Sequence, residues 1–410
     1  MSRISLYRSL VIAASATVAL GLAGCADANK KHETMRQEQY NHWNMTRVGV
    51  MYQLAEQQYA VGEYDKCRET LAGAMALKAQ HAPLYTLAAK VELENGSLDL
   101  AAGYLKSSVQ IDPANPEPYY LLGVVYQRWQ KSDVAHDYYQ QAWDRKPNEP
   151  LYLLAVTEMK ITLGRIDEAQ KLLEDKMVYF EQTAALRVAL ARVYVLKGDY
   201  DAAAKYYREA TVLLPDDQSI RRSYAETLFF SGHYAQALPI LEDLHKRSDV
   251  LDKESTTVML GQTYLNLRRP QDARNILQEV CRDHPNNIEA YLTLGKACIQ
   301  TNDLQLAISA GRRILKIDQE NVQALIIVAL VQQKQKNWAD AQITLVKAER
   351  IAPTDSTVLC MLGISAQQLG QKDTAAACFS KAVEANPKDT WAQELLATTK
   401  PVTRADEQAP

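Results

Sequence analysis

Few residues in this sequence are spaced for chemistry. Cys281 and His284 stand three apart, which is half of a metal site, and no second pair lies nearby in the sequence. Glu92 and Glu94 are two residues apart on a predicted helix, so their carboxylates point to different faces and cannot form a dyad. Phosphate-binding, dinucleotide-binding, zinc-protease and serine-hydrolase motifs do not occur. The sequence therefore predicts no catalytic residue, no metal, no cofactor and no small-molecule substrate, and a protein that is not an enzyme.

The six cysteines have no regular short spacing, which argues against a disulfide framework or a zinc knuckle. Cys67 and Cys298 fall on apolar stripes of predicted helices and are expected to be small buried hydrophobic residues. The chain of 410 residues carries a formal net charge of −3 and no basic run of five or more. This charge pattern lacks the footprint of a nucleic-acid-binding protein, so no nucleic acid is expected as a partner.

Cys25 differs from the other cysteines because of what precedes it. Arg3 and Arg8 form a basic start without any acid, and an apolar run at residues 10–24 leads to Cys25. The run is shorter than the ~18–20 residues that span a membrane. A basic start, a short apolar run and small residues before a cleavage point predict an export signal at residues 1–24.

The ending Leu22-Ala23-Gly24-Cys25 resembles the bacterial lipobox. The resemblance implies cleavage before Cys25 and lipidation of its sulfur, so that acyl chains such as palmitate anchor the protein to a membrane. It also implies sorting by the next residue, and Ala26 is not the aspartate that retains such proteins in the inner membrane. We expect an exported lipoprotein on the outer membrane that faces the periplasm.

One period organises the rest of the sequence. Small residues recur in steps of 34, and Ala135 is one of them. A second small residue lies twelve positions before each, as Gly123 does, and a large residue lies four positions after most of them, as Tyr139 does. Small residues let two antiparallel helices approach closely and large residues fill the gap, so each unit predicts a helical hairpin. The repeated small residues, in steps of 34 with one step of 36, are Cys67, Ala101, Ala135, Ala169, Ala203, Ala237, Ala273, Ala307, Ala341 and Ala375.

This order of residues resembles the tetratricopeptide repeat (TPR), and the clearest copy is Tyr119-x2-Leu122-Gly123-x2-Tyr126, then Ala135-x3-Tyr139, then Pro147. The resemblance implies an all-α fold, a right-handed α-solenoid of about ten TPR helical hairpins with a C-terminal capping helix. The predicted division of the chain is the signal at 1–24, the lipidated cysteine, tether and N-terminal helix at 25–47, the repeats at 48–389, the cap at 390–398 and a disordered tail at 399–410.

Some positions depart from the expected pattern. In the fourth repeat, Lys176 stands where a small or apolar residue is usual, and Glu181 stands where proline is usual. The sixth repeat has two extra residues within 245–251. In the eighth repeat, Gly311 stands where a large filling residue is usual. We expect bends or weak points there. Before the repeats, Tyr40 and Trp43 lie at helical spacing and are expected to pack on the first repeat.

In this family the first helix of each hairpin lines a concave face, where the fifth, ninth and twelfth positions share one stripe. Here the stripe is largely apolar, which suits an extended or helical protein segment as a partner. The alternative is that superhelical curvature buries the stripe as core. The candidate partner-binding residues are Tyr52, Tyr59, Tyr120, Leu154, Ile161, Val188, Arg192, Val195, Arg222, Glu226, Phe229 and Phe230.

Among these residues, Phe230 is expected to be less buried than Phe229 and to act as an aromatic anchor flanked by Arg222 and Glu226. The alternative is that Phe230 only covers the hairpin turn near His233.

The combined features predict a lipid-anchored scaffold that binds proteins during assembly of a cell-envelope complex for secretion, pilus formation, polysaccharide export or outer-membrane assembly. An activator that docks on a cell-wall synthase and a glycan-binding protein are the alternatives. The fold by itself does not choose among these functions.

Overall fold

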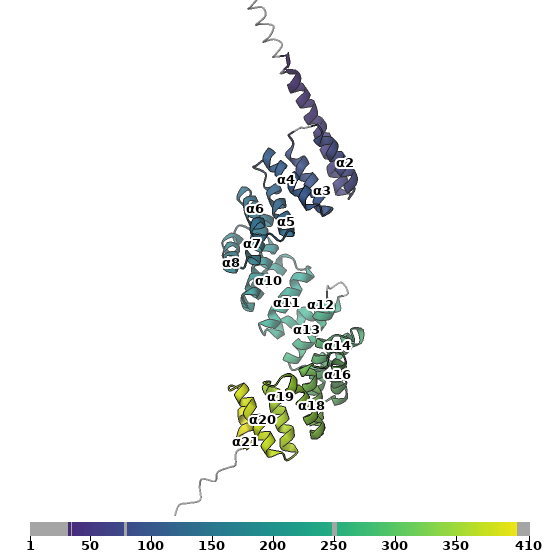
Figure 1. Cartoon of the computed structure of the whole chain (residues 1–410), viewed down its shortest axis with the longest axis vertical. Helices are drawn as coiled ribbons and strands as arrows, with labels where there is room; N and C mark the ends of the chain where they lie inside the picture. The colour runs from purple at the N-terminus through teal and green to yellow at the C-terminus, as the bar shows by residue number, and fades with distance from the viewer. Residues whose placement is uncertain (1–31, 34, 78–79, 248–251, 400–410) are drawn as a thin grey trace, which may run out of the picture. The chain divides into compact units, whose positions relative to one another are not determined.

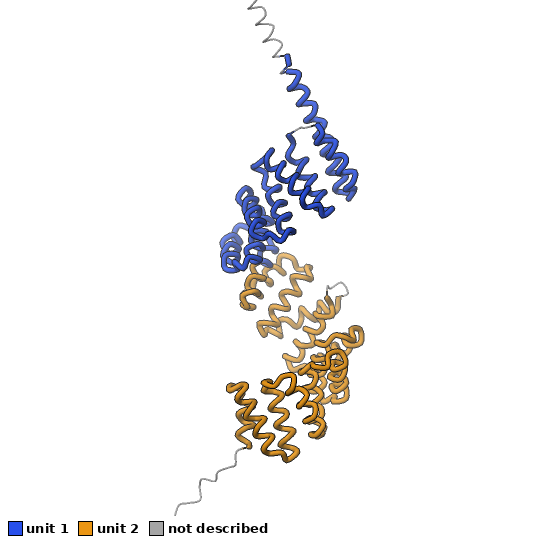
Figure 2. Tube along the Cα trace, viewed as in Figure 1, with its two compact units in different colours: residues 1–189 blue, residues 190–410 orange. Residues whose placement is uncertain are grey.

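The computed structural model describes residues 32–33, 35–77, 80–247 and 252–399, and among these residues it contains helices and no β-strand (Figure 1). The chain forms two compact units, residues 1–189 and 190–410, whose boundary falls inside α9 (Ala184–Leu196) (Figure 2). The predicted all-α architecture of repeated helical hairpins is confirmed. The predicted export signal, Cys25 and most of the predicted C-terminal tail lie outside the described residues.

Unit 1 begins with a long helix at residues 35–60, the N-terminal helix. The helices that follow pack, from α2 to α8, on their neighbours in chain order. They are α2 (Tyr64–Met75), α3 (Ala82–Glu94), α4 (Leu98–Ile111), α5 (Pro116–Arg128), α6 (Ser132–Arg145), α7 (Pro150–Thr162), α8 (Ile166–Met177) and the first part of α9.

Unit 2 continues the same order and ends on a single helix, α21, that packs on the last hairpin. Its helices after α9 are α10 (Tyr200–Leu213), α11 (Gln218–Phe230), α12 (Tyr234–Lys246), α13 (Lys253–Asn266), α14 (Pro270–Asp283), α15 (Ile288–Gln300), α16 (Leu304–Ile317), α17 (Val322–Lys334), α18 (Trp338–Ile351), α19 (Ser356–Gln368), α20 (Lys372–Ala385) and α21 (Thr390–Thr399).

The repeated small residues form the closest contacts inside the hairpins. Cys67 and all nine repeated alanines have no exposed surface. A Cβ placed on Gly123 would lie 2.5 Å from the Tyr139 ring, and one on Gly261 would lie 2.8 Å from Leu277. The large residue of the second helix therefore fills the space that glycine leaves on the first helix, as the sequence predicts.

The hairpin bends require a left-handed backbone. At six of the bends, Gly62, Gly96, Gly164, Gly198, Gly232 and Gly370 have φ values between 74° and 80°. Gln130, Arg268, Asn302 and Lys336 occupy the equivalent bends with φ near 60°, a conformation that costs more for a residue with a Cβ. These four bends explain why glycine alone does not mark every hairpin in the sequence.

Two expectations from the sequence are wrong. Gly311 is not a weak point, because a Cβ there would lie 2.8 Å from Val328, so the glycine lets α16 and α17 pack closely. Tyr40 and Trp43 do not pack into the first repeat, since 57% and 55% of their surfaces are exposed. The apolar pattern of the N-terminal helix predicted a buried face, but these two residues point away from it.

Candidate functional site

The stripe of fifth and twelfth positions on the first helices is neither an open apolar surface nor continuous core. Thr86, Val258 and Cys360 at fifth positions are buried, whereas most others, such as Tyr52 and Leu292, are partly buried. The two alternatives drawn from the sequence therefore each hold for part of the stripe. A binding surface has to be located from pockets and contacts instead.

Tyr52 and Tyr59 from the predicted set come together in one pocket of unit 1, the first-repeat pocket, which has a volume of about 320 Å³. The N-terminal helix, α3 and the start of α5 line it, so it lies on the first helices of three successive hairpins. Its lining residues are Tyr52, Glu56, Tyr59, Pro83, Thr86, Leu87, Lys90, Asn115 and Glu117.

The walls of the first-repeat pocket are fixed by polar contacts. The Tyr52 hydroxyl donates to Glu56 at 2.6 Å, and the Lys90 ammonium lies 2.5 Å from the Glu117 carboxylate. Asn115 caps α5 by accepting a hydrogen bond from the backbone N–H of Glu117 at 3.0 Å. The lining of the pocket therefore combines Pro83 and Leu87 with phenol, amide, carboxylate and ammonium groups.

Burial shifts the pKa values of titratable side chains in and beside this pocket. It raises the pKa of Tyr52 and of Tyr59, with Glu56 and Glu94 respectively adding to the effect, so both phenols stay neutral hydrogen-bond donors. Beside the pocket, the His81 ring lies tilted against the Tyr52 ring with centroids 5.1 Å apart, and burial lowers the pKa of its imidazole. The side chains offer recognition groups and no activated nucleophile.

The other predicted residues of unit 1 lie outside this pocket. Tyr120 is partly buried between two tyrosines, with ring centroids 5.4 Å from Tyr139 and 5.3 Å from Tyr152. Leu154 and Ile161 on α7 are also partly buried. These residues form an apolar lining whose binding role stays a prediction.

On α9, Val188 is the last predicted residue of unit 1 and is partly buried. Arg192 and Val195 belong to unit 2, where Arg192 is exposed and Val195 partly buried.

Arg222 and Glu226 on α11 are engaged within unit 2. Arg222 Nε donates to Glu226 at 2.8 Å and its second guanidinium nitrogen donates to Asp252 at 2.8 Å. The latter bond connects α11 to the start of α13, so the pair fixes one hairpin against the next. The sequence could not show this, because Asp252 is thirty residues away from Arg222.

Phe230 is 59% exposed and Phe229 is partly buried, the order that the sequence predicts. The Phe230 ring lies 5.5 Å from Phe229 and 5.5 Å from Tyr200, and Phe229 lies 5.4 Å from Tyr234. Tyr200 and Tyr234 each begin a second helix directly after a bend. Phe230 is thus part of an aromatic cluster at the hairpin bends, away from the Arg222 ion pairs.

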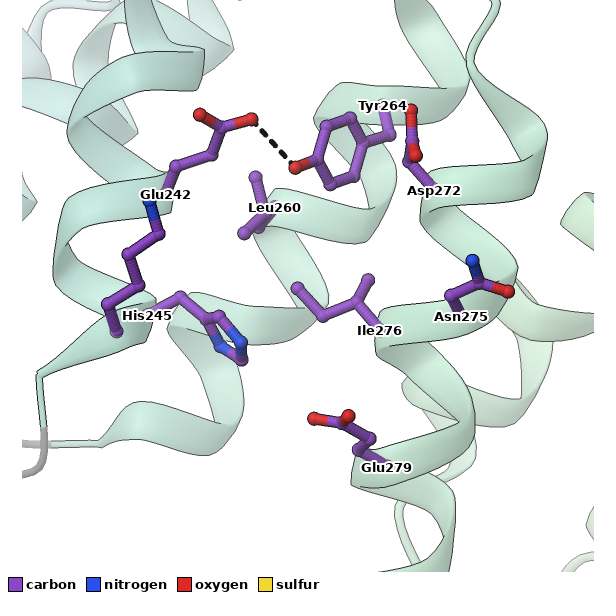
Figure 3. A pocket seen from close by; sticks show the side chains of 9 residues that line it. Glu242, His245, Leu260, Tyr264, Asp272, Asn275, Ile276 and Glu279 are labelled. Carbon is purple, nitrogen blue, oxygen red and sulfur yellow. Dashed lines mark hydrogen bonds between the residues drawn. The ribbon is translucent and has the colours of Figure 1, made fainter.

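A second pocket, of about 400 Å³, was not predicted from the sequence (Figure 3). It lies between α12, α13 and α14, with Leu260 and Ile276 at its apolar floor and Glu242 and Glu279 among its walls. The Tyr264 hydroxyl donates to Glu242 at 2.7 Å, as Figure 3 shows. The only sequence signal for it is the step of 36 in the sixth repeat.

The cysteine and histidine residues considered from the sequence are engaged in packing or in an ion pair. Cys281 and Cys298 are buried, which raises the pKa of each thiol to about 12, and His284 lies 2.9 Å from Glu254. Within the described ranges, no three metal-ligating side chains come together. None of the described helices has the length and apolar composition that a membrane crossing needs.

Family models identify the repeat. Models of the tetratricopeptide repeat match residues 184–227, 258–322 and 356–389. These segments therefore carry tetratricopeptide repeats, and the hairpin packing described above extends the same architecture to their neighbours.

Several curated proteins are similar in sequence. The CTR9 homolog of Arabidopsis thaliana is 21% identical over 73% of this chain and 29% of its own length. The TPR repeat-containing protein YpiA of Bacillus subtilis is 22% identical over 72% of this chain and 70% of its own length. Protein O-mannosyl-transferase Tmtc3 of Drosophila melanogaster is 27% identical over 42% of this chain and 17% of its own length. The chain spans less than a third of the CTR9 homolog and of Tmtc3.

Two solved structures align with large parts of this chain. Cut9 in the Cut9–Hcn1 hetero-tetramer of APC/C has a TM-score of 0.46 at 12% identity, over 90% of this chain and 95% of that one. A tetratricopeptide repeat protein of Parabacteroides merdae has a TM-score of 0.45 at 16% identity, over 62% of this chain and 98% of that one.

Proposed function

We propose that this chain of tetratricopeptide repeats is a lipid-anchored scaffold that holds protein partners during assembly of a cell-envelope complex. The protein-binding part is supported by the repeats, since stacked hairpins present long surfaces. The envelope part rests on residues 1–25, whose pattern is that of an exported lipoprotein. Secretion, pilus formation, polysaccharide export and outer-membrane assembly are the processes that such an anchor would serve.

The first-repeat pocket is the observation that carries the proposal. Two predicted binding residues, Tyr52 and Tyr59, line it together with the Lys90–Glu117 ion pair. A partner peptide could place apolar side chains against Pro83 and Leu87 while its backbone bonds to the phenols and charged groups. Aromatic side chains in a concave, partly desolvated setting are those that dominate binding energies.

The proposal is tested by capturing partners in the membranes of cells that express the full chain. Tyr59→Ala should weaken capture by about 2 kcal/mol or more if the pocket is the binding site. Tyr179→Ala is the matched control, because Tyr179 is 75% exposed on the same unit and outside the pocket. A captured set that is unchanged by Tyr59→Ala, with normal folding of the variant, would contradict the pocket. Captured cell-wall synthases would favour the activator alternative.

The anchor is tested in the same cells with Cys25→Ser. The natural chain should partition with outer membranes, and the variant should lack lipid and remain unprocessed. Natural chain that is soluble after export, with an unmodified N-terminus, would remove the lipoprotein part of the proposal. The capture result would still decide the protein-binding part.

A further inference from the structure

The N-terminal helix exposes an apolar stripe that no hairpin covers among the described residues. Tyr40, Trp43, Val50, Leu54 and Val61 are 57%, 55%, 63%, 48% and 73% exposed. Val48 and Ala55 on the adjacent face have no exposed surface and pack against α2 and α3. The helix therefore has two apolar faces, of which the described part of unit 1 buries one.

The spacing of the exposed residues is that of a helix–helix seam. Positions 40, 43, 47, 50, 54, 57 and 61 alternate steps of three and four through three heptads, with Arg47 and Gln57 as the two polar members. Such a repeat keeps one stripe turned towards a partner helix along its whole length. The N-terminal helix spans residues 35–60, so nearly all of the stripe lies on continuous helix.

The exposed area is large enough for a stable contact. With roughly 200 Å² for a whole aromatic side chain and somewhat less for valine or leucine, the five exposed fractions give about 500 Å². Patches of about 300–600 Å² are the largest on typical monomers and are often functional. Two such faces together would bury about 1,000 Å², the lower limit for a specific interface.

We propose that the stripe pairs with the same stripe of a second copy of this chain, in antiparallel orientation. The stripe is nearly symmetric about Val50, so a two-fold axis there places Tyr40 opposite Val61 and Trp43 opposite Gln57. An isologous contact needs this kind of self-complementarity. This proposal does not rest on the lipid anchor or on the first-repeat pocket.

The charge of Arg47 selects the antiparallel orientation. In a parallel pair the two Arg47 side chains would face each other in one layer, and like charges at close range repel. In the antiparallel pair Arg47 lies opposite Leu54 of the second copy, where its methylene stem packs and its guanidinium reaches the edge of the seam. Arg47 already lies over Trp43, 5.5 Å from the ring centroid, which holds the aromatic at the same edge.

The proposal is tested by sedimentation of the full-length chain over a range of concentrations. The natural chain should form dimers, and Val50→Glu combined with Leu54→Glu should raise the dissociation constant by about 100-fold or more. Val212→Glu is the matched control, since Val212 is 76% exposed on α10 and lies outside the stripe. Circular dichroism of each variant separates loss of pairing from loss of folding.

Disulfide cross-linking determines the orientation. Tyr40→Cys combined with Val61→Cys should cross-link two chains, whereas Tyr40→Cys alone should not. A bond within one chain is excluded, because 21 residues of helix separate the two positions by about 30 Å. The natural chain is the background control, since its five described cysteines are buried.

Several outcomes would overturn the proposal. A natural chain that stays monomeric at tens of micromolar would do so, as would dimers unaffected by the two glutamates. Cross-linking by Tyr40→Cys alone would indicate a parallel pair and refute the antiparallel seam. A monomeric chain that binds phosphatidylethanolamine–phosphatidylglycerol vesicles through the stripe would assign it to a membrane surface instead.

Discussion

The two ends of the described chain face the same physical problem and solve it differently. A hairpin array leaves an apolar face at each end, because the terminal hairpin has no further neighbour. At the C-terminal end, α21 covers that face, with Ala392 fully buried and Leu395 packed against Phe379 and its neighbours. At the N-terminal end, the stripe around Val50 stays exposed. Among the described residues, one end is closed by the chain itself, and the other leaves an apolar stripe uncovered.

The closing helix is held by polar contacts as well as by packing. Asp389 accepts hydrogen bonds from the backbone N–H groups of Trp391 at 3.0 Å and Ala392 at 3.2 Å, and the Ser356 hydroxyl donates to its other oxygen. This is an N-cap that also ties α21 to α19. Within the ranges that the structure describes, the apolar stripe of the N-terminal helix has no comparable covering helix.

The largest contrast is expected when one aromatic residue is removed at each end. Phe379→Ala should lower the free energy of unfolding by about 3–5 kcal/mol, because its fully buried ring would leave a cavity. Trp43→Ala should change the unfolding of the dissociated chain little, because 55% of Trp43 is already exposed. Denaturant unfolding of dilute samples measures both. Equal losses at the two ends would show that Trp43 belongs to a core.

A smaller contrast, of opposite sign, is expected for glycine replacements. Gly363→Ala should destabilise by about 1–3 kcal/mol, because the new Cβ would collide with the Phe379 ring. Gly49→Ala should stabilise by about 0.5–1 kcal/mol, because nothing lies within 4 Å of the new Cβ and alanine favours a helix interior. Thermal unfolding of the two variants gives both signs. A destabilising Gly49→Ala would mean that the N-terminal helix is more tightly covered than described.

The smallest effect is a loosening of α21 in acid. Hydrogen bonds hold the pKa of Asp389 below its usual value near 3.8, and the bond from the Ser356 hydroxyl has a larger effect than the bond from the Ala392 N–H. A carboxylate with a lowered folded pKa stabilises above its unfolded pKa and loses that contribution as pH falls through the folded value. We therefore expect the amide protection factors of α21, which are corrected for the intrinsic pH dependence of exchange, to fall below about pH 4, while those of the N-terminal helix do not.

Asp389→Asn provides the control for the acid effect. The variant should show lower protection factors in α21 at neutral pH and no further change of them between about pH 5 and pH 3, because no carboxylate is left to protonate. The same acid response in the natural chain and in the variant would place the titrating group elsewhere.

The repeated core could be predicted from the sequence because its determinants are local. Ala135 and Gly123 lie twelve residues apart within one hairpin, and the same pattern of small residues recurs in ten units of the sequence. The order of exposure of Phe229 and Phe230 follows from position on one helix in the same way. Contacts between hairpins are less visible, as the ion pair of Arg222 with Asp252 shows.

The stripe on the N-terminal helix was missed for a different reason. Tyr40 and Trp43 have the spacing of a core face, and a sequence pattern does not reveal whether a neighbour is present to cover that face. The pocket beside Tyr264 depends on how α12 and α14 are spaced across the irregular sixth repeat. A one-dimensional period contains no information about that spacing.

The contrast between the ends is tested most directly by hydrogen exchange of the full-length chain at two concentrations on either side of the dimer dissociation constant. Exchange in residues 40–61 should slow on raising the concentration, because pairing of the stripes protects the N-terminal helix, while residues 390–399 should exchange at the same rate in both samples. Equal exchange of residues 40–61 at the two concentrations would contradict the account, since the open end would then have no second copy to cover it.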